Sequence, residues 1–185
     1  MARYSGNIQV GLLATIVART LGAKNIYAID SNASRLQTAK RHGANPLHLN
    51  EKPRESILSA TENRGADVVI EAVGHGDALR LAYLFFIKWD NSSFDLLRPF
   101  GLIVSIGVQQ DPLPFTGPEC YAKNLRVQFG RCPVRGVFNK ALKMLLQVQD
   151  ELGEFVEVWK GLEDAPRAYE LFDKGEKGKI AFEME

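Results

Sequence analysis

The chain has 185 residues, of which 45% are hydrophobic and 24% are charged, a balance typical of soluble globular domains. Its 23 basic and 22 acidic residues leave a formal net charge of +1, which gives no indication of nucleic-acid or membrane binding. The longest apolar stretch, at residues 79–89, is too short to cross a bilayer and contains Arg80 and Lys88. Since no signal-peptide pattern is present either, we expect a cytoplasmic protein.

The cysteines and histidines show no spacing that is typical of a metal site. The two cysteines are Cys120 and Cys132, and the three histidines are His42, His48 and His75. There is no C-x-x-C pair and no H-E-x-x-H helix, the spacings that gather zinc ligands within one segment. We therefore expect no self-contained zinc site, and two reduced thiols rather than a disulfide.

In the first part of the chain, the apolar pattern predicts strands that alternate with helices. In chain order, the elements are a helix at 10–21 that Gly22 ends, a strand at 25–30, a helix that Ser31 or Asn32 caps and Gly43 ends, a weak strand at 47–49, a helix that starts at 53 and Gly65 closes, and a strand at 67–74. This alternation is typical of an α/β fold with a doubly wound parallel sheet, whose ligand crevice lies at the carboxyl ends of the strands.

The second part continues the pattern after an interruption. A helix is predicted at 77–83, and residues 84–93 look like an insertion into it. The elements that follow are a helix and turn at 94–101, strands at 102–108 and 125–130, a helix at 139–152, a helix that Asp164 caps with Pro166 in its first turn, and a closing strand at 179–184.

The start of the chain resembles a dinucleotide-binding turn with one substitution. Gly6 and Gly11 have the outer spacing of G-x-G-x-x-G, but Ile8 replaces the glycine at which phosphate approaches the backbone most closely. Asp30 ends the next predicted strand, where a carboxylate can accept hydrogen bonds from both hydroxyls of a ribose and would repel a 2′-phosphate, which favours NAD over NADP. Arg35 is expected near the same ribose. The alternatives are a loop or capping role for Asp30 and a solvated surface position for Arg35.

Segments along most of the chain resemble zinc-type medium-chain alcohol dehydrogenases, in particular the formaldehyde-dehydrogenase-like and threonine-dehydrogenase-like branch. These segments are residues 10–44, 65–82, 96–108, 115–135 and 162–182. The resemblance implies a Rossmann-type cofactor domain at residues 1–154 and a C-terminal segment, residues 155–185, that belongs to an otherwise absent catalytic domain. Members of this family use NAD(P) and zinc to oxidise alcohols or reduce aldehydes.

The resemblance also implies, position by position, a set of cofactor-binding residues. They are Gly6, Val10 and Gly11 at the phosphate turn, Asp30 and Arg35 at the adenosine ribose, Val73 and Gly74 beside the adenosine half, Gly107 and Val108 facing the nicotinamide, Gly130 and Arg131 in the loop near that ring, and Lys179 at the pyrophosphate. Packing alone is the alternative for Val73, Gly107 and Val108, and a surface position is the alternative for Lys179.

The chain also departs from the family. Family members are roughly twice as long, and their N-terminal half supplies the catalytic zinc ligands. We therefore expect the NAD-binding portion of a zinc-type alcohol or aldehyde dehydrogenase-like oxidoreductase, weak or inactive alone, which acts on an alcohol or aldehyde only if a catalytic domain is supplied. The alternatives are a non-catalytic Rossmann-fold interaction or regulatory module, and a part of a full dehydrogenase. Since family members usually dimerise through the sixth strand, residues 125–130 are candidates for pairing two chains at the sheet edge.

Overall fold

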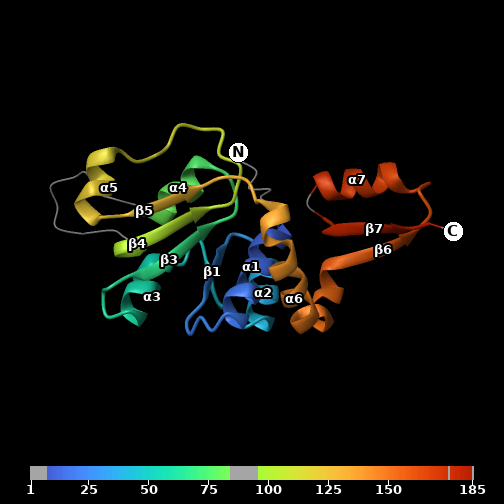
Figure 1. The fold of residues 1–185 in the computed structure, drawn as a ribbon, viewed down its shortest axis with the longest axis horizontal. Coiled ribbons are helices and arrows are strands. Elements are labelled where there is room, and N and C mark those ends of the chain that lie inside the picture. The colour runs from blue at the N-terminus through green and yellow to red at the C-terminus, as the bar shows by residue number, and fades with distance from the viewer. Residues whose placement is uncertain (1–7, 84–95, 175, 185) are drawn as a thin grey trace. The chain divides into compact units, whose positions relative to one another are not determined.

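The computed structural model describes residues 8–83, 96–174 and 176–184 (Figure 1). The chain divides into two compact units, Met1–Arg131 and Cys132–Glu185. The sequence predicted a cofactor domain that ends at residue 154. The division into compact units does not show which residues bind a cofactor, so this boundary stays a prediction. Gly6 and the predicted insertion at 84–93 lie outside the described residues.

The first unit alternates helices with parallel strands. Its elements are α1 (Ile8–Thr20), β1 (Tyr27–Asp30), α2 (Ala33–Arg41), β2 (Asn45–His48), α3 (Pro53–Ala60), β3 (Ala66–Glu71), α4 (Gly76–Tyr83), β4 (Leu97–Ser105), α5 (Gly117–Lys123) and β5 (Arg126–Phe129). Strands β1 and β2 form one parallel pair, and β3, β4 and β5 lie side by side in a second parallel sheet (Figure 1). The expected α/β class with parallel strands is confirmed.

Helix ends follow the signals in the sequence. Asn32 caps α2, since its side chain accepts a hydrogen bond of 3.2 Å from the backbone N–H of Arg35. Gly22, Gly43 and Gly65 each adopt a positive φ, of 87°, 92° and 86°, at the points where the chain leaves a helix and turns toward the next strand. That conformation costs glycine little, so these stops were readable without a structure.

The core of the three-stranded sheet is apolar and lies between α4 and the strands. Leu79, Leu97 and Ile103 are almost fully buried and contact each other. The partly buried side chains that pack against this cluster are Val69, Phe115, Leu125 and Val127. Ile103 and Ser105 point to the interior from β4, so the second half of this strand is anchored on the core.

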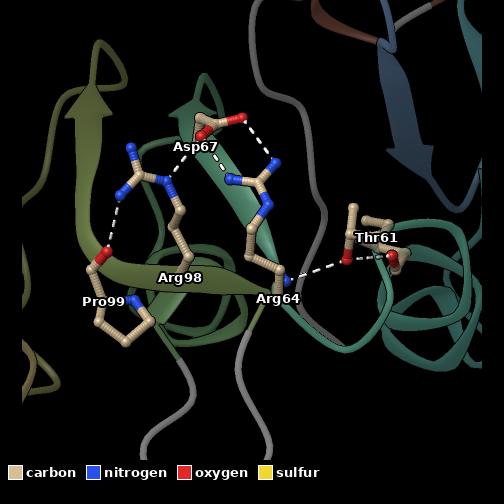
Figure 2. Close-up of polar contacts among 7 residues, drawn as sticks. Thr61, Arg64, Asp67, Arg98 and Pro99 are labelled. Atoms are coloured by element: carbon tan, nitrogen blue, oxygen red, sulfur yellow. Dashed lines mark hydrogen bonds and ion pairs between the residues drawn. The ribbon is translucent and has the colours of Figure 1, made fainter.

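The helix and turn predicted at 94–101 are wrong for the described part of that segment, because residues 97–101 begin β4. Pro99 cannot continue a helix, and Arg98 is held beside β3 by Asp67. The Nε of Arg98 donates a 2.6 Å hydrogen bond to Asp67 Oδ1, and Arg64 donates two more to the same carboxylate, at 2.6 and 3.1 Å (Figure 2). The hydrogen bonds from Arg64 and Arg98 hold the pKa of Asp67 well below its usual range.

The start of β4 is also irregular in register. Ala66 is opposite Leu97, whereas Val68 is opposite Leu102, so residues 98–101 bulge out against a single residue of β3. Phe100, one of the bulged residues, has a positive φ of 61°.

The second unit is built on a two-stranded parallel sheet. Its elements are α6 (Val134–Leu152), a 3₁₀ turn (Gly153–Phe155), β6 (Val156–Lys160), α7 (Ala165–Asp173) and β7 (Lys179–Glu183). Asp164 precedes α7 as predicted, but its side chain makes no capping hydrogen bond, so that part of the prediction is wrong. In the described part of the chain, no helix is both long and apolar enough to span a membrane.

Candidate functional site

Four strands of the first unit end in a polar side chain at their carboxyl end. Strand β2 ends in His48, and the other three end in Asp30 on β1, Glu71 on β3 and Ser105 on β4. In a parallel α/β sheet, ligands bind just beyond the carboxyl ends of the strands, in the loops that lead to the helices. The candidate site therefore consists of the loops that follow these three strands and of the beginning of α1.

The beginning of α1 lies against the end of β3. A Cβ built on Gly11 would lie 3.8 Å from the Cβ of Ala72, an ordinary van der Waals distance. The helix and strand are therefore neighbours here, but the contact would also accept alanine. Val10, the other residue predicted on this helix, is half-buried, and Gly6 lies outside the described residues.

The Asp30 carboxylate is held in place by the turn that follows β1. Its Oδ1 accepts a 2.8 Å hydrogen bond from the backbone N–H of Asn32, and its Oδ2 lies 3.6 Å from Nη1 of Arg35. The side chains of Asp30 and Arg35 are 30% and 20% exposed, respectively. Since the helix cap is Asn32, Asp30 fixes the turn instead, and its side chain stays partly exposed. The structure thus brings Asp30 and Arg35 together, and their role at the ribose stays a prediction.

A buried carboxylate that the sequence analysis missed lies at the end of β3. Glu71 is 4% exposed. Its Oε1 accepts hydrogen bonds from the backbone N–H groups of Val73 and Gly74, at 2.6 and 2.7 Å. Its Oε2 accepts hydrogen bonds of 2.7 Å each from Ser105 Oγ and Gln109 Nε2. The available signal was an acid as the last residue of the strand, directly after the apolar residues 68–70.

The loops that follow β3 and β4 contact each other through two glycines. Gly74 has a φ of 78°, and a Cβ built on it would lie 2.7 Å from both the N and the O atom of Val108. A Cβ on Gly107 would lie 2.5 Å from Cα of Gly74 and 2.8 Å from the carbonyl carbon of Val73. The structure thus brings Val73 and Gly74, predicted beside the adenosine half, next to Gly107 and Val108, predicted to face the nicotinamide. Packing accounts for the glycines, but not for Val108, whose side chain is 75% exposed.

The remaining predicted residues follow β5 or belong to the second unit. Gly130, with a φ of 142°, and the exposed Arg131 follow β5 at the end of the first unit. Lys179 is the exposed first residue of β7 in the second unit. The roles assigned to Arg131 and Lys179 stay predictions.

Metal-ligating side chains are scattered over the described residues, where no three of His, Cys, Asp or Glu form a group that could hold a metal ion. Cys120 is half-buried and Cys132 is exposed. Burial, and then the neighbouring charge of Glu119, raises the pKa of the Cys120 thiol.

Residues 10–147 match the family model for zinc-binding dehydrogenases. Zinc-type alcohol dehydrogenase B of Aspergillus flavus is 41% identical over 177 residues, which are 94% of this chain and 39% of that protein. The solved structure of alcohol dehydrogenase TADH from Thermus sp. ATN1 superposes with a TM-score of 0.81 and 33% identity, over 98% of this chain and 49% of that one. For an alcohol dehydrogenase from Thermotoga maritima, the values are 0.83 and 28%, over 97% and 48%.

The chain thus spans less than half the length of these relatives. The resemblance expected from the sequence is confirmed, and so is the Rossmann-type fold class.

Proposed function

Because the chain belongs to the zinc-binding dehydrogenase family, we propose that it is the NAD-binding portion of an alcohol or aldehyde dehydrogenase-like oxidoreductase. When bound, NAD supplies the acceptor for a hydride. The residues of this chain bind and orient the coenzyme. In this proposal, activity on an alcohol or aldehyde requires the zinc-bearing half that the relatives also contain, and the chain by itself is weakly active or inactive.

The observation that carries the proposal is the position of Asp30. Its carboxylate stands at the carboxyl end of β1, is oriented by the N–H of Asn32, and keeps a partly exposed edge. A carboxylate in such a place accepts hydrogen bonds from two neighbouring ribose hydroxyls. These residues therefore fit the sugar of a dinucleotide.

The same cluster favours NAD over NADP. A 2′-phosphate would meet the negative charge of Asp30 in a half-buried position, where electrostatic repulsion is less screened than in bulk water. Arg35 is positive, but its guanidinium already lies 3.6 Å from the Asp30 carboxylate. A phosphate would have to compete with that carboxylate for the arginine.

The loops after β3 and β4 supply a surface for the rest of the coenzyme. Their glycine contact leaves no side chain between the two backbones, and Val108 presents an exposed apolar side chain beside it. Apolar groups at strand ends can support a flat ring while backbone groups fix its orientation. This arrangement supports the assignment of Gly107 and Val108 to the nicotinamide side.

Titration of the purified chain with NADH and NADPH tests the proposal. We expect NADH to bind at least about tenfold more tightly than NADPH, and Asp30→Ala to weaken NADH by at least about tenfold, since one hydrogen bond to a charged group contributes about 1.5–3 kcal/mol. Glu55→Ala, which removes an exposed carboxylate from α3, is the control and should leave affinity unchanged. A chain that binds neither nucleotide would refute the proposal.

The alternative, a non-catalytic interaction or regulatory module, is favoured by a different observation. Val68 and Ile70 on β3 are 49% and 45% exposed, whereas strands of a doubly wound sheet are normally buried on both faces. Exposed apolar surface can serve as a protein contact. A chain that binds no dinucleotide but retains its fold would favour this alternative. Pairing of two chains along the edge of β5 also stays a prediction.

A further inference from the structure

The Glu71 carboxylate is buried at the end of β3 and has a full set of hydrogen-bond donors. A buried carboxylate is costly unless hydrogen bonds replace the water that it loses. Here four donors compensate it: two backbone N–H groups, one hydroxyl and one side-chain amide. Ser105 is the register partner of Glu71 on β4, and the other three donors lie in the loops beyond the two strands.

Each oxygen of this carboxylate serves a different loop. Oε1 accepts only from the loop after β3, through Val73 and Gly74. Oε2 accepts from the end of β4 and the loop beyond it, through Ser105 and Gln109. Residues far apart in the sequence are therefore tied to one rigid group.

The backbone of Glu71 strengthens the same connection. Its carbonyl oxygen accepts hydrogen bonds from the N–H groups of Ile106 and Gly107, at 2.8 and 3.2 Å. These bonds hold Gly107 against Gly74, where the two glycine backbones make close contact. A small rotation of either loop would break this contact and lengthen the bonds to Glu71.

We propose that Glu71 is a positioning residue that sets coenzyme affinity by holding the two loops in one fixed arrangement. This role rests on the proposed function, because it assumes that Val73, Gly74, Gly107 and Val108 line the coenzyme. Glu71 itself lies behind the loops and acts through them. A binding surface that is fixed before the ligand arrives avoids the entropy cost of ordering it during binding.

If Glu71 has this role, its replacement should weaken the binding of NADH more than the binding of ADP-ribose. In Glu71→Ala, the N–H groups of Val73 and Gly74 lose their acceptor. The loop that carries Val108 loses the side-chain bonds through Ser105 and Gln109 and keeps only the bonds to the backbone carbonyl of residue 71. We expect NADH to bind at least about tenfold more weakly. ADP-ribose, which lacks the nicotinamide ring, should lose less, because it does not use Gly107 and Val108, which are assigned to that ring. A general loss of folded protein would weaken both ligands equally.

The experiment compares variants of the full chain by NADH and ADP-ribose titration and by amide hydrogen exchange without ligand. Glu71→Gln keeps an acceptor and should restore most of the affinity. Gln109→Ala removes only one half-buried donor of the second loop, so it should fold even if Glu71→Ala does not, and it should still weaken NADH more than ADP-ribose. The control is Asp67→Ala at the opposite end of β3, which removes the hydrogen bonds to Arg64 and Arg98. It should leave NADH affinity unchanged.

We expect faster exchange at Val73 and Gly74 in Glu71→Ala than in the Asp67→Ala control. Equal NADH affinity in the unaltered chain, Glu71→Ala and Gln109→Ala overturns the role, as does an equal loss of NADH and ADP-ribose. If the unaltered chain binds no NADH, the proposed function fails first and the role fails with it. If the unaltered chain binds NADH and the variants bind it equally well, only the role of Glu71 fails.

Discussion

The backbone contact between Gly74 and the loop after β4 can be tested with one methyl group. In Gly74→Ala, the new Cβ would lie 2.7 Å from the N and O atoms of Val108, and the residue would have to keep a φ of 78°. The positive φ alone costs an L-residue about 1–2 kcal/mol. Pushing the neighbouring backbone aside adds about 1–3 kcal/mol, the usual cost of overpacking.

Gly22→Ala is a matched control because it separates these two costs. Gly22 has a similar φ of 87°, but nothing lies within 4 Å of a Cβ built on it. We expect Gly22→Ala to lower the free energy of unfolding by about 1–2 kcal/mol. Gly74→Ala should lower it by about 1–3 kcal/mol more than that.

Urea denaturation followed by far-ultraviolet circular dichroism measures both variants on the same chain. In a chain of this size, each kcal/mol also lowers the melting temperature by about 2–4 °C. Gly74→Ala should further weaken NADH binding, whereas Gly22→Ala should not. If both variants lose the same stability, the two loops do not touch in the way described, and the glycine contact cannot be what shapes the site.

Two further predictions follow from the pKa shifts. Because Arg64 and Arg98 lower the folded-state pKa of Asp67, its contribution to stability is present at pH values above its ordinary pKa of 3.8 and is lost as the pH falls below that value. Asp67→Asn should therefore lower the urea midpoint at pH 7. Below about pH 4, its midpoint should differ less from that of the unaltered chain. A difference in midpoint that is independent of pH would contradict this. Because burial raises the pKa of the Cys120 thiol, iodoacetamide should label exposed Cys132 faster than Cys120 at pH 7.5 when labelling is followed by peptide mass spectrometry; equal rates would contradict the shift.

Local signals in the sequence predicted much of the fold. The helix stops at Gly22, Gly43 and Gly65 were readable because a left-handed turn favours glycine at each of them. The cap at Asn32 was readable because its side chain bonds a residue only three positions along. Helix α5, by contrast, was missed although Thr116 and Glu119 form a capping box at its start.

Features that depend on distant residues could not be predicted in this way. The beginning of β4 was assigned to a helix because its conformation depends on Asp67, which Arg98 reaches across 31 positions of the chain. The importance of Glu71 was hidden for the same reason, since Ser105 and Gln109 lie 34 and 38 residues further along. Composition and periodicity describe neighbours in the sequence, whereas these side chains become neighbours only when the sheet forms.

The bulge at residues 98–101 interrupts the pairing of β4 with β3, so the residues before it and the residues after it are paired independently. From Leu102 onward, the strand is fixed on both sides, by Val68 on β3 and by Arg126 on β5, whatever path the chain takes before it. Leu97 is buried and paired with Ala66 before the bulge, so a change of length upstream of Leu97 is stopped there and is not passed on to Ser105. The length of the chain before β4 can therefore vary during evolution while the far end of the strand, with its hydroxyl, keeps its place.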